Sequence, residues 1–142
     1  LLLLEHIASE FEEISVVGVS QGANIVAKLH HTLTADVDLR AIDQKISTYA
    51  IIEGAVPPTY WLDSEDYANF ALFSSSWETV LRWSGPDLES LVADPRVLFL
   101  SSTCNDAVYS EVYGPLNLGD RHVVFEGEHE IPVAELIALI SQ

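Results

Sequence analysis

The chain has 142 residues, and 49% of them are hydrophobic, which is enough for the core of one domain. Its formal net charge is −16, from 22 acidic and 6 basic residues, so it lacks the basic surface that nucleic acids and anionic membranes attract. No apolar run approaches the roughly 20 residues of a membrane span, and the first residues lack the basic region and cleavage site of a secretory signal.

The single cysteine, Cys104, excludes an intramolecular disulfide and a zinc site built from cysteines. This cysteine usage fits a reducing compartment, and we expect a cytoplasmic protein. Methionine is absent even at position 1, so we expect the sequence to be a piece of a longer protein.

The first part of the chain predicts a helix, a strand and a second helix. Apolar residues recur at helical spacing over residues 3–11, with glutamates between them, which indicates an amphipathic helix. The β-branched run over residues 14–19 is typical of a buried strand, and a second helical pattern covers residues 21–31. Ser20 is therefore expected at a junction between a strand and a helix.

The middle of the chain predicts one more strand and a long aromatic-rich excursion. After a polar stretch over residues 32–45, residues 48–56 form the pattern of a buried strand. Pro57 ends it, because proline cannot continue a central strand. Residues 57–94 are rich in aromatic side chains, and we expect them to form a cap, to line a pocket or to pack as helices on the sheet.

The last part of the chain predicts two strands and a closing helix. The apolar runs over residues 97–100 and 123–125 are typical of buried strands, and polar residues follow each of them. Pro132 stands at the start of an amphipathic pattern that continues to residue 140, a position that suits its fixed φ.

The alternation of helices with nearly all-apolar strands predicts an α/β fold. We expect a mostly parallel sheet of about four strands, flanked by helices on both faces, because strands of this composition are buried on both sides. We predict a single domain over residues 1–142.

Residues 18–22 have the sequence G-x-S-x-G, which between a strand and a helix is the nucleophile elbow. The turn is so sharp that Ser20 must adopt an unfavourable backbone conformation, and we expect a Cβ at Gly18 or Gly22 to clash. The serine hydroxyl would then be exposed, and the N–H of Gln21 would point at a developing oxyanion at the helix N-terminus. The alternative is an ordinary tight turn with a capping serine.

A serine hydroxyl is a poor nucleophile unless a histidine accepts its proton and an acid orients that histidine. In this kind of fold the chain order is serine, acid, histidine. Asp106 follows the third predicted strand and His129 follows the fourth, so both fall along the sheet edge that carries Ser20. Asp120, in a turn ahead of the last strand, is the rival acid, and we favour Asp106. We predict a catalytic triad of Ser20, Asp106 and His129.

The other polar candidates have ordinary structural explanations. His30 and His31 are expected to close a helix, where histidine suits the dipole, and Cys104 and Asn105 are expected in a loop. Surface or packing positions explain the remaining histidines and an acidic group that resembles a metal cluster: His6, His122, Asp63, Glu65 and Asp66. We therefore expect no metal and no other cofactor.

Three segments resemble a known family. Residues 17–23, with the sequence VGVSQGA, are similar to the elbow of small serine hydrolases of the α/β-hydrolase superfamily. The FSH-type hydrolases and the phospholipase/carboxylesterase and acyl-protein-thioesterase group are the nearest types. Residues 102–108 resemble their acid loop, and residues 126–132 resemble their histidine loop. The resemblance implies hydrolysis of a small-molecule acyl ester or thioester through an acyl-enzyme.

The resemblance also implies a missing part. The sheet of the family has about eight strands with the elbow after the fifth, whereas this sequence begins one helix before its elbow. We therefore expect a bare sheet edge and an apolar face, which a partner chain or an N-terminal segment would complete. The loop that supplies a second oxyanion donor would also be missing, so we expect this piece alone to be weak or inactive. A serine peptidase, an acyltransferase and a non-catalytic binding or scaffold domain are the alternatives.

Overall fold

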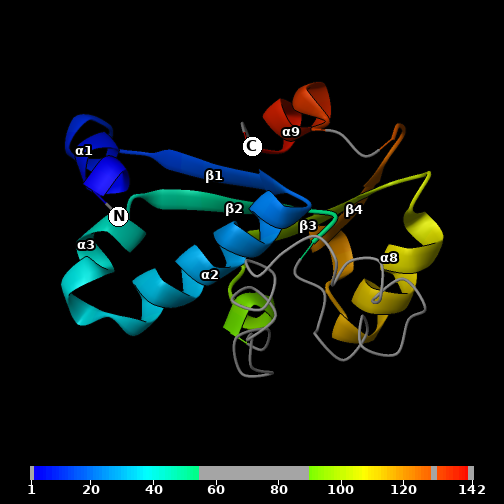
Figure 1. The fold of residues 1–142 in the computed structure, drawn as a ribbon, viewed down its shortest axis with the longest axis horizontal. Helices are drawn as coiled ribbons and strands as arrows, with labels where there is room; N and C mark the ends of the chain where they lie inside the picture. Colours follow the sequence, from blue (N-terminus) through cyan, green and yellow to red (C-terminus); the bar gives the residue numbers. More distant parts are fainter. Residues whose placement is uncertain (1, 55–89, 129–130, 141–142) are drawn as a thin grey trace, which may run out of the picture.

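A computed structural model of the chain describes residues 2–54, 90–128 and 131–140 (Figure 1). Its centre is a four-stranded, all-parallel sheet with the strand order β1-β2-β3-β4. The strands are β1 (Ile14–Val19), β2 (Ile46–Ile52), β3 (Val97–Ser102) and β4 (His122–Phe125). This architecture confirms the predicted α/β fold with a parallel sheet of four strands.

Helices cover both faces of the sheet (Figure 1). They are α1 (Leu2–Glu10), α2 (Gln21–Ala35), α3 (Arg40–Asp43), α8 (Asp106–Tyr113) and α9 (Val133–Ile140), with short 3₁₀ turns η1 (Val37–Leu39), η2 (Gly114–Leu116) and η3 (Gly119–Arg121). Pro132 directly precedes α9, and its carbonyl accepts a hydrogen bond from the N–H of Leu136 at 2.8 Å. The described helices include none that is long and apolar enough to cross a membrane.

The core lies on both sides of the sheet because successive strand residues point to opposite faces. In β2, Tyr49 and Ile51 pack beneath α2 and α8, whereas Ala50 and Ile52 pack toward α9. The cluster on the α2 side is the larger, with buried members Ala23, Val26, Ala27, Leu33, Ile46, Tyr49, Ile51, Leu91, Val97, Phe99, Tyr109, Tyr113 and Leu118. Most residues of the two central strands are thus buried, which explains their largely apolar sequences.

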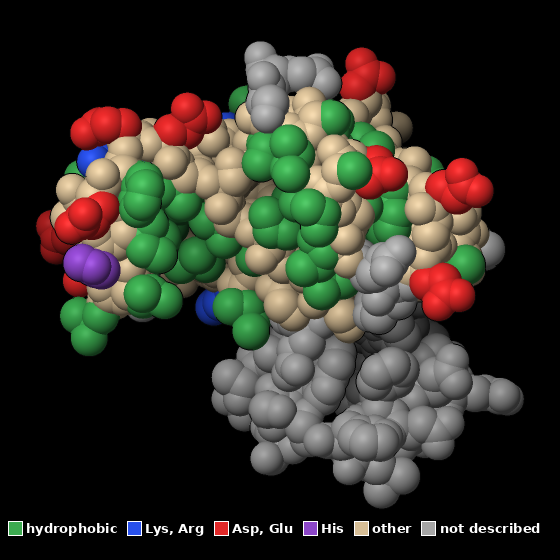
Figure 2. Space-filling view, turned by 90° about the horizontal axis from the view of Figure 1, so that it is seen from above, with side chains coloured by type: hydrophobic (Ala, Val, Ile, Leu, Met, Phe, Trp, Pro, Cys, Tyr) green, Lys and Arg blue, Asp and Glu red, His purple; other side chains and the backbone are tan. Residues whose placement is uncertain are grey.

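The face that carries α9 is more open. Figure 2 views the molecule from this side, and hydrophobic side chains gather on the visible surface. Exposed apolar residues of α1, α9 and their flanks include Leu2, Leu3, Phe11, Ile131, Val133 and Ile137. Among the strands that the structure describes, β1 is an outer strand that pairs with β2 alone. Among the described strands β1 is therefore an edge strand, and apolar side chains are exposed on the face that carries α9.

Several element boundaries differ from the predictions, and three of the differences have a clear physical reason. β2 ends at Ile52 and not at residue 56, because Glu53 has a φ of 50°, which an extended strand cannot contain. β3 continues through Ser102, since its last two serines are buried and remain in the sheet. α2 continues to Ala35, so the predicted polar stretch begins as helix. The excursion predicted for residues 57–94 lies outside the described residues up to residue 89.

Candidate active site

Ser20 connects β1 to α2 in a strained conformation, with φ 54° and ψ −117°. A positive φ is uncommon for a residue other than glycine and requires support from its surroundings. Its N–H donates to the carbonyl of Ile52 at 2.8 Å, and its carbonyl accepts from the N–H of Ala23 at 3.1 Å. The Ser20 side chain makes no capping hydrogen bond to α2, so the turn does not serve to cap the helix with this hydroxyl.

The turn around Ser20 brings backbone segments into close contact. A Cβ at Gly18 would lie 2.2 Å from the carbonyl oxygen of Gly22, which no side chain can tolerate. A Cβ at Gly22 would meet nothing within 4 Å, so the steric reason predicted for both glycines holds only for Gly18. Sequence reasoning missed Gly54, where a Cβ would lie 2.4 Å from the Cβ of Ala23 and 2.7 Å from the carbonyl oxygen of Ser20. The absence of a side chain at Gly18, in β1, and at Gly54, after β2, thus allows both segments to lie against the turn at the start of α2.

Gln21 is the first residue of α2, directly after Ser20. The N–H groups of Ala23 and Asn24 both donate to the carbonyl of Ser20, at 3.1 and 3.4 Å. The N–H groups of Gln21 and Gly22 precede them, and helices leave their first N–H groups without a helical acceptor. These donors stand at the positive end of the helix dipole, beside the Ser20 side chain.

Asp106 follows β3 after a three-residue turn and begins α8. Its partly exposed carboxylate accepts a hydrogen bond from the hydroxyl of Ser110 at 2.8 Å. Because β1 and β3 are parallel to β2, Asp106 and Ser20 lie beyond the same, carboxyl, edge of the sheet. The rival Asp120 is exposed in η3, which precedes β4 and thus lies at the opposite, amino, edge.

His129 lies outside the described residues, so the structure gives no distance from it to Ser20 or Asp106. The chain that leads toward it is tied to the turn that carries Asp106. The N–H of Thr103 donates to the carbonyl of Phe125 at 2.9 Å, and the N–H of Gly127 donates to Oγ1 of Thr103 at 3.4 Å. The segment after β4 therefore leaves the sheet beside that turn.

A buried carboxylate, Glu53, lies at the same edge, and sequence reasoning did not single it out. Glu53 follows β2 and is 2% exposed. Its Oε1 accepts hydrogen bonds from the hydroxyl of Ser102 and, at 2.9 Å, from the N–H of Ser102. Nδ2 of Asn105 lies 3.1 Å from each carboxylate oxygen. A glutamate inside the apolar run of a central strand is the sequence signal that indicates such a group.

Asn105 and Tyr113 complete the polar layer around Glu53. Asn105 stands at the N-cap position of α8, but its side chain makes no cap and instead donates to Glu53. The hydroxyl of Tyr113 donates to the carbonyl of Gly54 at 2.6 Å and accepts from the N–H of Gly54 at 3.1 Å. Burial raises the pKa of Tyr113 well above its ordinary value, so the phenol stays protonated.

His122, at the start of β4, packs beneath α8. Its Nε2 lies 2.9 Å from the hydroxyl of Ser101, and its ring meets the ring of Tyr113 at 5.2 Å in an edge-on arrangement. Burial lowers the pKa of His122, and the charge of Asp106 opposes that shift. His122 is thus a packing histidine, as the sequence suggests.

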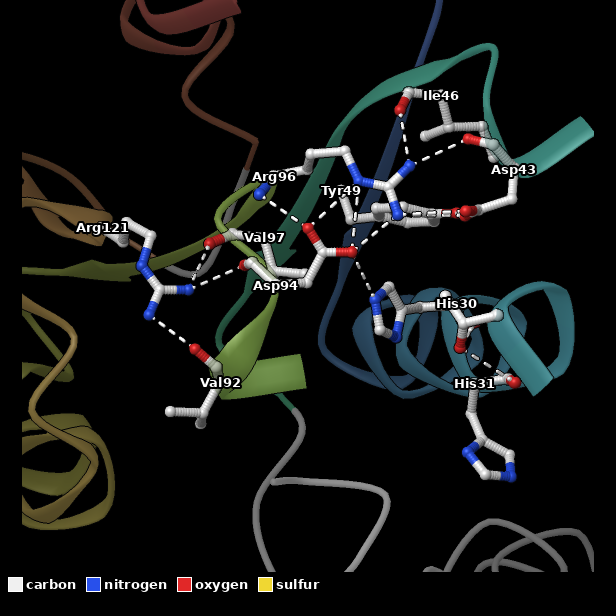
Figure 3. Close-up of polar contacts among 11 residues, drawn as sticks. His30, His31, Asp43, Ile46, Tyr49, Val92, Asp94, Arg96, Val97 and Arg121 are labelled. Atoms are coloured by element: carbon white, nitrogen blue, oxygen red, sulfur yellow. Dashed lines mark hydrogen bonds and ion pairs between the residues drawn. The ribbon is translucent and has the colours of Figure 1, made fainter. Parts of the chain in front are cut away.

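A second polar network lies at the amino edge (Figure 3). Arg96 donates to the carboxylates of Asp43 and Asp94, with Nη2 at 3.1 Å from Asp43 Oδ1 and 2.6 Å from Asp94 Oδ2. The hydroxyl of Tyr49 donates to Asp43 at 2.7 Å. The prediction that His30 closes the helix is wrong, because α2 continues for another turn, to Ala35. The ring of His30 is buried, and Nε2 lies 3.0 Å from Oδ2 of Asp94.

The charges at the amino edge stabilise one another. Burial disfavours the ionised form of Asp94, but hydrogen bonds from Arg96 outweigh burial and hold its pKa below the usual range. Burial, followed by the hydrogen bond to Asp43, raises the pKa of Tyr49. This network joins α2, α3, β2 and the start of β3, at the end of the sheet away from Ser20.

Within the described ranges, no group of three or more histidine, cysteine, aspartate or glutamate side chains is placed to hold a metal ion. Cys104 is exposed in the turn before Asp106. Asp63, Glu65 and Asp66 lie outside the described residues. A comparison of the chain with protein-family models, with curated proteins and with solved structures found no match.

Proposed function

We propose that this protein is a serine hydrolase that cleaves carboxylic esters or thioesters through an acyl-enzyme intermediate. The observation that supports the proposal most is the backbone of Ser20, a non-glycine residue with φ 54° at the turn from a parallel strand into a helix. Such strain costs about 1–3 kcal/mol and persists where surrounding contacts enforce it, most often at functional sites. The hydroxyl gains no capping bond from this position, so helix capping does not explain the strain.

The proposed chemistry assigns one role to each residue of the triad. The hydroxyl oxygen of Ser20 attacks the acyl carbon while His129 accepts the hydroxyl proton. The carbonyl oxygen becomes an oxyanion, which the N–H of Gln21 stabilises at the start of α2. The bond from the acyl carbon to the leaving oxygen or sulfur breaks, and the imidazolium returns the proton to the leaving alcohol or thiol. Water then attacks the acyl-serine by the same route, and the acid and the free serine are formed.

Asp106 is proposed to orient His129 and to stabilise the imidazolium form. Support comes from the sheet: Asp106 and Ser20 follow parallel strands and lie beyond the same edge. Asp120 precedes β4 at the other edge and is therefore the weaker candidate.

A fluorophosphonate probe tests the proposal, because it phosphonylates only activated serines. We expect the intact, folded protein, including any segment that precedes residue 1, to take up one probe per molecule at Ser20, located by peptide mass spectrometry. Ser20→Ala is expected to abolish labelling, whereas Ser15→Ala, a change of an exposed serine in the same strand, is expected to leave it unchanged. His129→Ala and Asp106→Asn are expected to slow labelling by about a hundredfold or more.

The contrary result is an intact, correctly folded protein, including any segment that precedes residue 1, whose Ser20 is not labelled over hours of exposure. That outcome would exclude the hydrolase and favour a binding or scaffold domain. Where labelling is observed, parallel assays with a short p-nitrophenyl ester, an acyl thioester and a peptide anilide compare ester, thioester and peptide hydrolysis. Turnover of the anilide alone would replace the proposal with a serine peptidase.

A further inference from the structure

We infer that Glu53 is a positioning residue, which holds the turn of Asp106 in register with the elbow of Ser20. The inference rests on the proposed function and deepens it. It follows from hydrogen bonds that connect residues 52–54 to both sides of the candidate site.

On one side, residues 52–54 support the elbow. The carbonyl of Ile52 accepts the N–H of Ser20 at 2.8 Å, which holds the strained residue against β2. Two residues later, Gly54 lies so close to the elbow that an added Cβ would be 2.7 Å from the carbonyl oxygen of Ser20. Glu53 stands between these two contacts, so the backbone on both sides of it lies against the elbow.

On the other side, the Glu53 side chain reaches the acid turn. Its carboxylate accepts from the N–H and hydroxyl of Ser102, at the end of β3, and from Nδ2 of Asn105. Asn105 is the residue directly before Asp106. The backbone N–H of Glu53 also donates to the carbonyl of Leu100 at 2.9 Å. One residue thus bridges the chain segments that carry Ser20 and Asp106.

The position of Glu53 is energetically unfavourable for a glutamate. Burial of a carboxylate is unfavourable unless hydrogen bonds compensate it, and a positive φ adds backbone strain. Glu53 combines both features, with 2% exposure and φ 50°. A glycine would relieve the strain, and an apolar residue would remove the buried polar group. A residue of this type is best explained by the alignment that its carboxylate provides.

The test measures the rate constant for fluorophosphonate labelling of Ser20 in Glu53→Gln and Asn105→Ala. Glutamine keeps the shape of the side chain but not its charge, and Asn105→Ala removes the contact to the acid turn without changing any charge. We expect each variant to label about tenfold more slowly than the wild type. We expect the double variant to be slower than either single one by much less than a further factor of ten, because both changes break one connection.

The matched control is Asp94→Asn, which also exchanges a hydrogen-bonded carboxylate for an amide, but at the amino edge. It is expected to lower the urea midpoint and to leave the labelling rate unchanged. The pH profile adds a readout that lost stability alone would not move. A misplaced Asp106 stabilises the imidazolium less, so the midpoint of labelling against pH should shift to lower pH in Asn105→Ala.

The outcomes separate the two proposals. If the intact, folded wild-type protein, including any segment that precedes residue 1, is not labelled, the hydrolase itself is excluded. If the wild type is labelled, and Glu53→Gln and Asn105→Ala label at the wild-type rate with the wild-type pH midpoint, Glu53 has no positioning role. If Glu53→Gln does not fold, Asn105→Ala, a change in a partly exposed turn, decides the question alone.

Discussion

The two edges of the parallel sheet contain polar networks of different kinds. At the amino edge, Arg96 binds Asp43 and Asp94, so opposite charges meet and hydrogen bond. At the carboxyl edge, the described donors to the carboxylate of Glu53 are the neutral groups of Ser102 and Asn105. Figure 3 shows the first network, which joins helices and strands that are distant in the sequence.

Backbone strain also separates the two networks, although Asn117, which precedes η3 and lies outside both networks, has a φ of 53° as well. Ser20 and Glu53, at the carboxyl edge, both have a positive φ, of 54° and 50°. The residues of the amino-edge network have ordinary conformations among the described residues. One edge therefore matches charges and gains stability, whereas the other maintains strained geometry around a hydroxyl. This contrast separates substitutions that should alter stability from those that should alter the reactivity of Ser20.

The largest expected effect is at the elbow. Gly18→Ala would place a Cβ 2.2 Å from the carbonyl oxygen of Gly22, and the next nearest atoms are also backbone, at 2.4 Å in Gly22 and 2.7 Å in Ala23. We expect a loss of about 3 kcal/mol or more in the free energy of unfolding, measured by urea denaturation, and loss of Ser20 labelling.

Gly22→Ala is the control, because nothing lies within 4 Å of its added Cβ. It should change stability by less than about 1 kcal/mol, and a small gain is reasonable in a helix. Equal destabilisation by the two alanines would mean that the turn is not held by the close approach at Gly18.

The amino edge provides the next largest effect. Arg96→Met removes the cation between two carboxylates, and we expect a loss of about 2–3 kcal/mol, less than for a fully buried pair because the site is partly open to water. Ser20 labelling should keep its wild-type rate. A slower reaction in a folded Arg96→Met protein would contradict the separation of the two edges.

The pH dependence of this loss has a definite sign. The pKa of Asp94 is lowered in the folded protein, so its contribution is complete above the unfolded pKa of about 4 and is lost as the pH falls through the folded value. The difference in unfolding free energy between wild type and Arg96→Met should therefore be constant from pH 7 to about pH 5 and should shrink in stronger acid.

The sequence predicts the frame of the molecule because the frame depends on local patterns. Apolar runs locate all four strands, and the bounds predicted for β1 agree with the structure. The motif at residues 18–22 places Ser20 at the strand–helix junction, and the order of elements places Asp106 at the same edge.

The contacts that the sequence does not predict depend on partners far away in the chain. Glu53 meets Ser102 and Asn105 only because β2 and β3 are neighbours in a particular register. The close approach at Gly54 depends on how α2 crosses the end of β2. No local pattern contains either fact. The relation of His129 to Ser20 stays a prediction.

Substitutions of two buried tyrosines, one at each edge, test the same contrast with smaller expected losses of stability. Tyr113→Phe leaves both backbone groups of Gly54 without the hydroxyl that satisfies them, and we expect a loss of about 2 kcal/mol. Tyr49→Phe removes one donor to Asp43, which Arg96 still binds, so about 1 kcal/mol is expected. Urea denaturation at pH 7 measures both. Only Tyr113→Phe should also slow the labelling of Ser20, because Gly54 touches the elbow.

The smallest expected effect concerns His122, which joins the carboxyl-edge helix α8 to β4. Burial lowers its pKa, so the unfolded chain binds a proton more readily than the folded protein. Stability that is present above about pH 6.5 should therefore decrease as the pH falls through the folded pKa. His122→Gln, which can still bond to Ser101, removes this component. Between pH 7.5 and pH 5, the unfolding free energy of His122→Gln should fall less than that of the wild type. The difference between the two decreases should be smaller than the loss expected for Tyr49→Phe. Parallel curves for the two proteins would show that His122 does not titrate differently on folding, and the acid sensitivity would then belong to other groups.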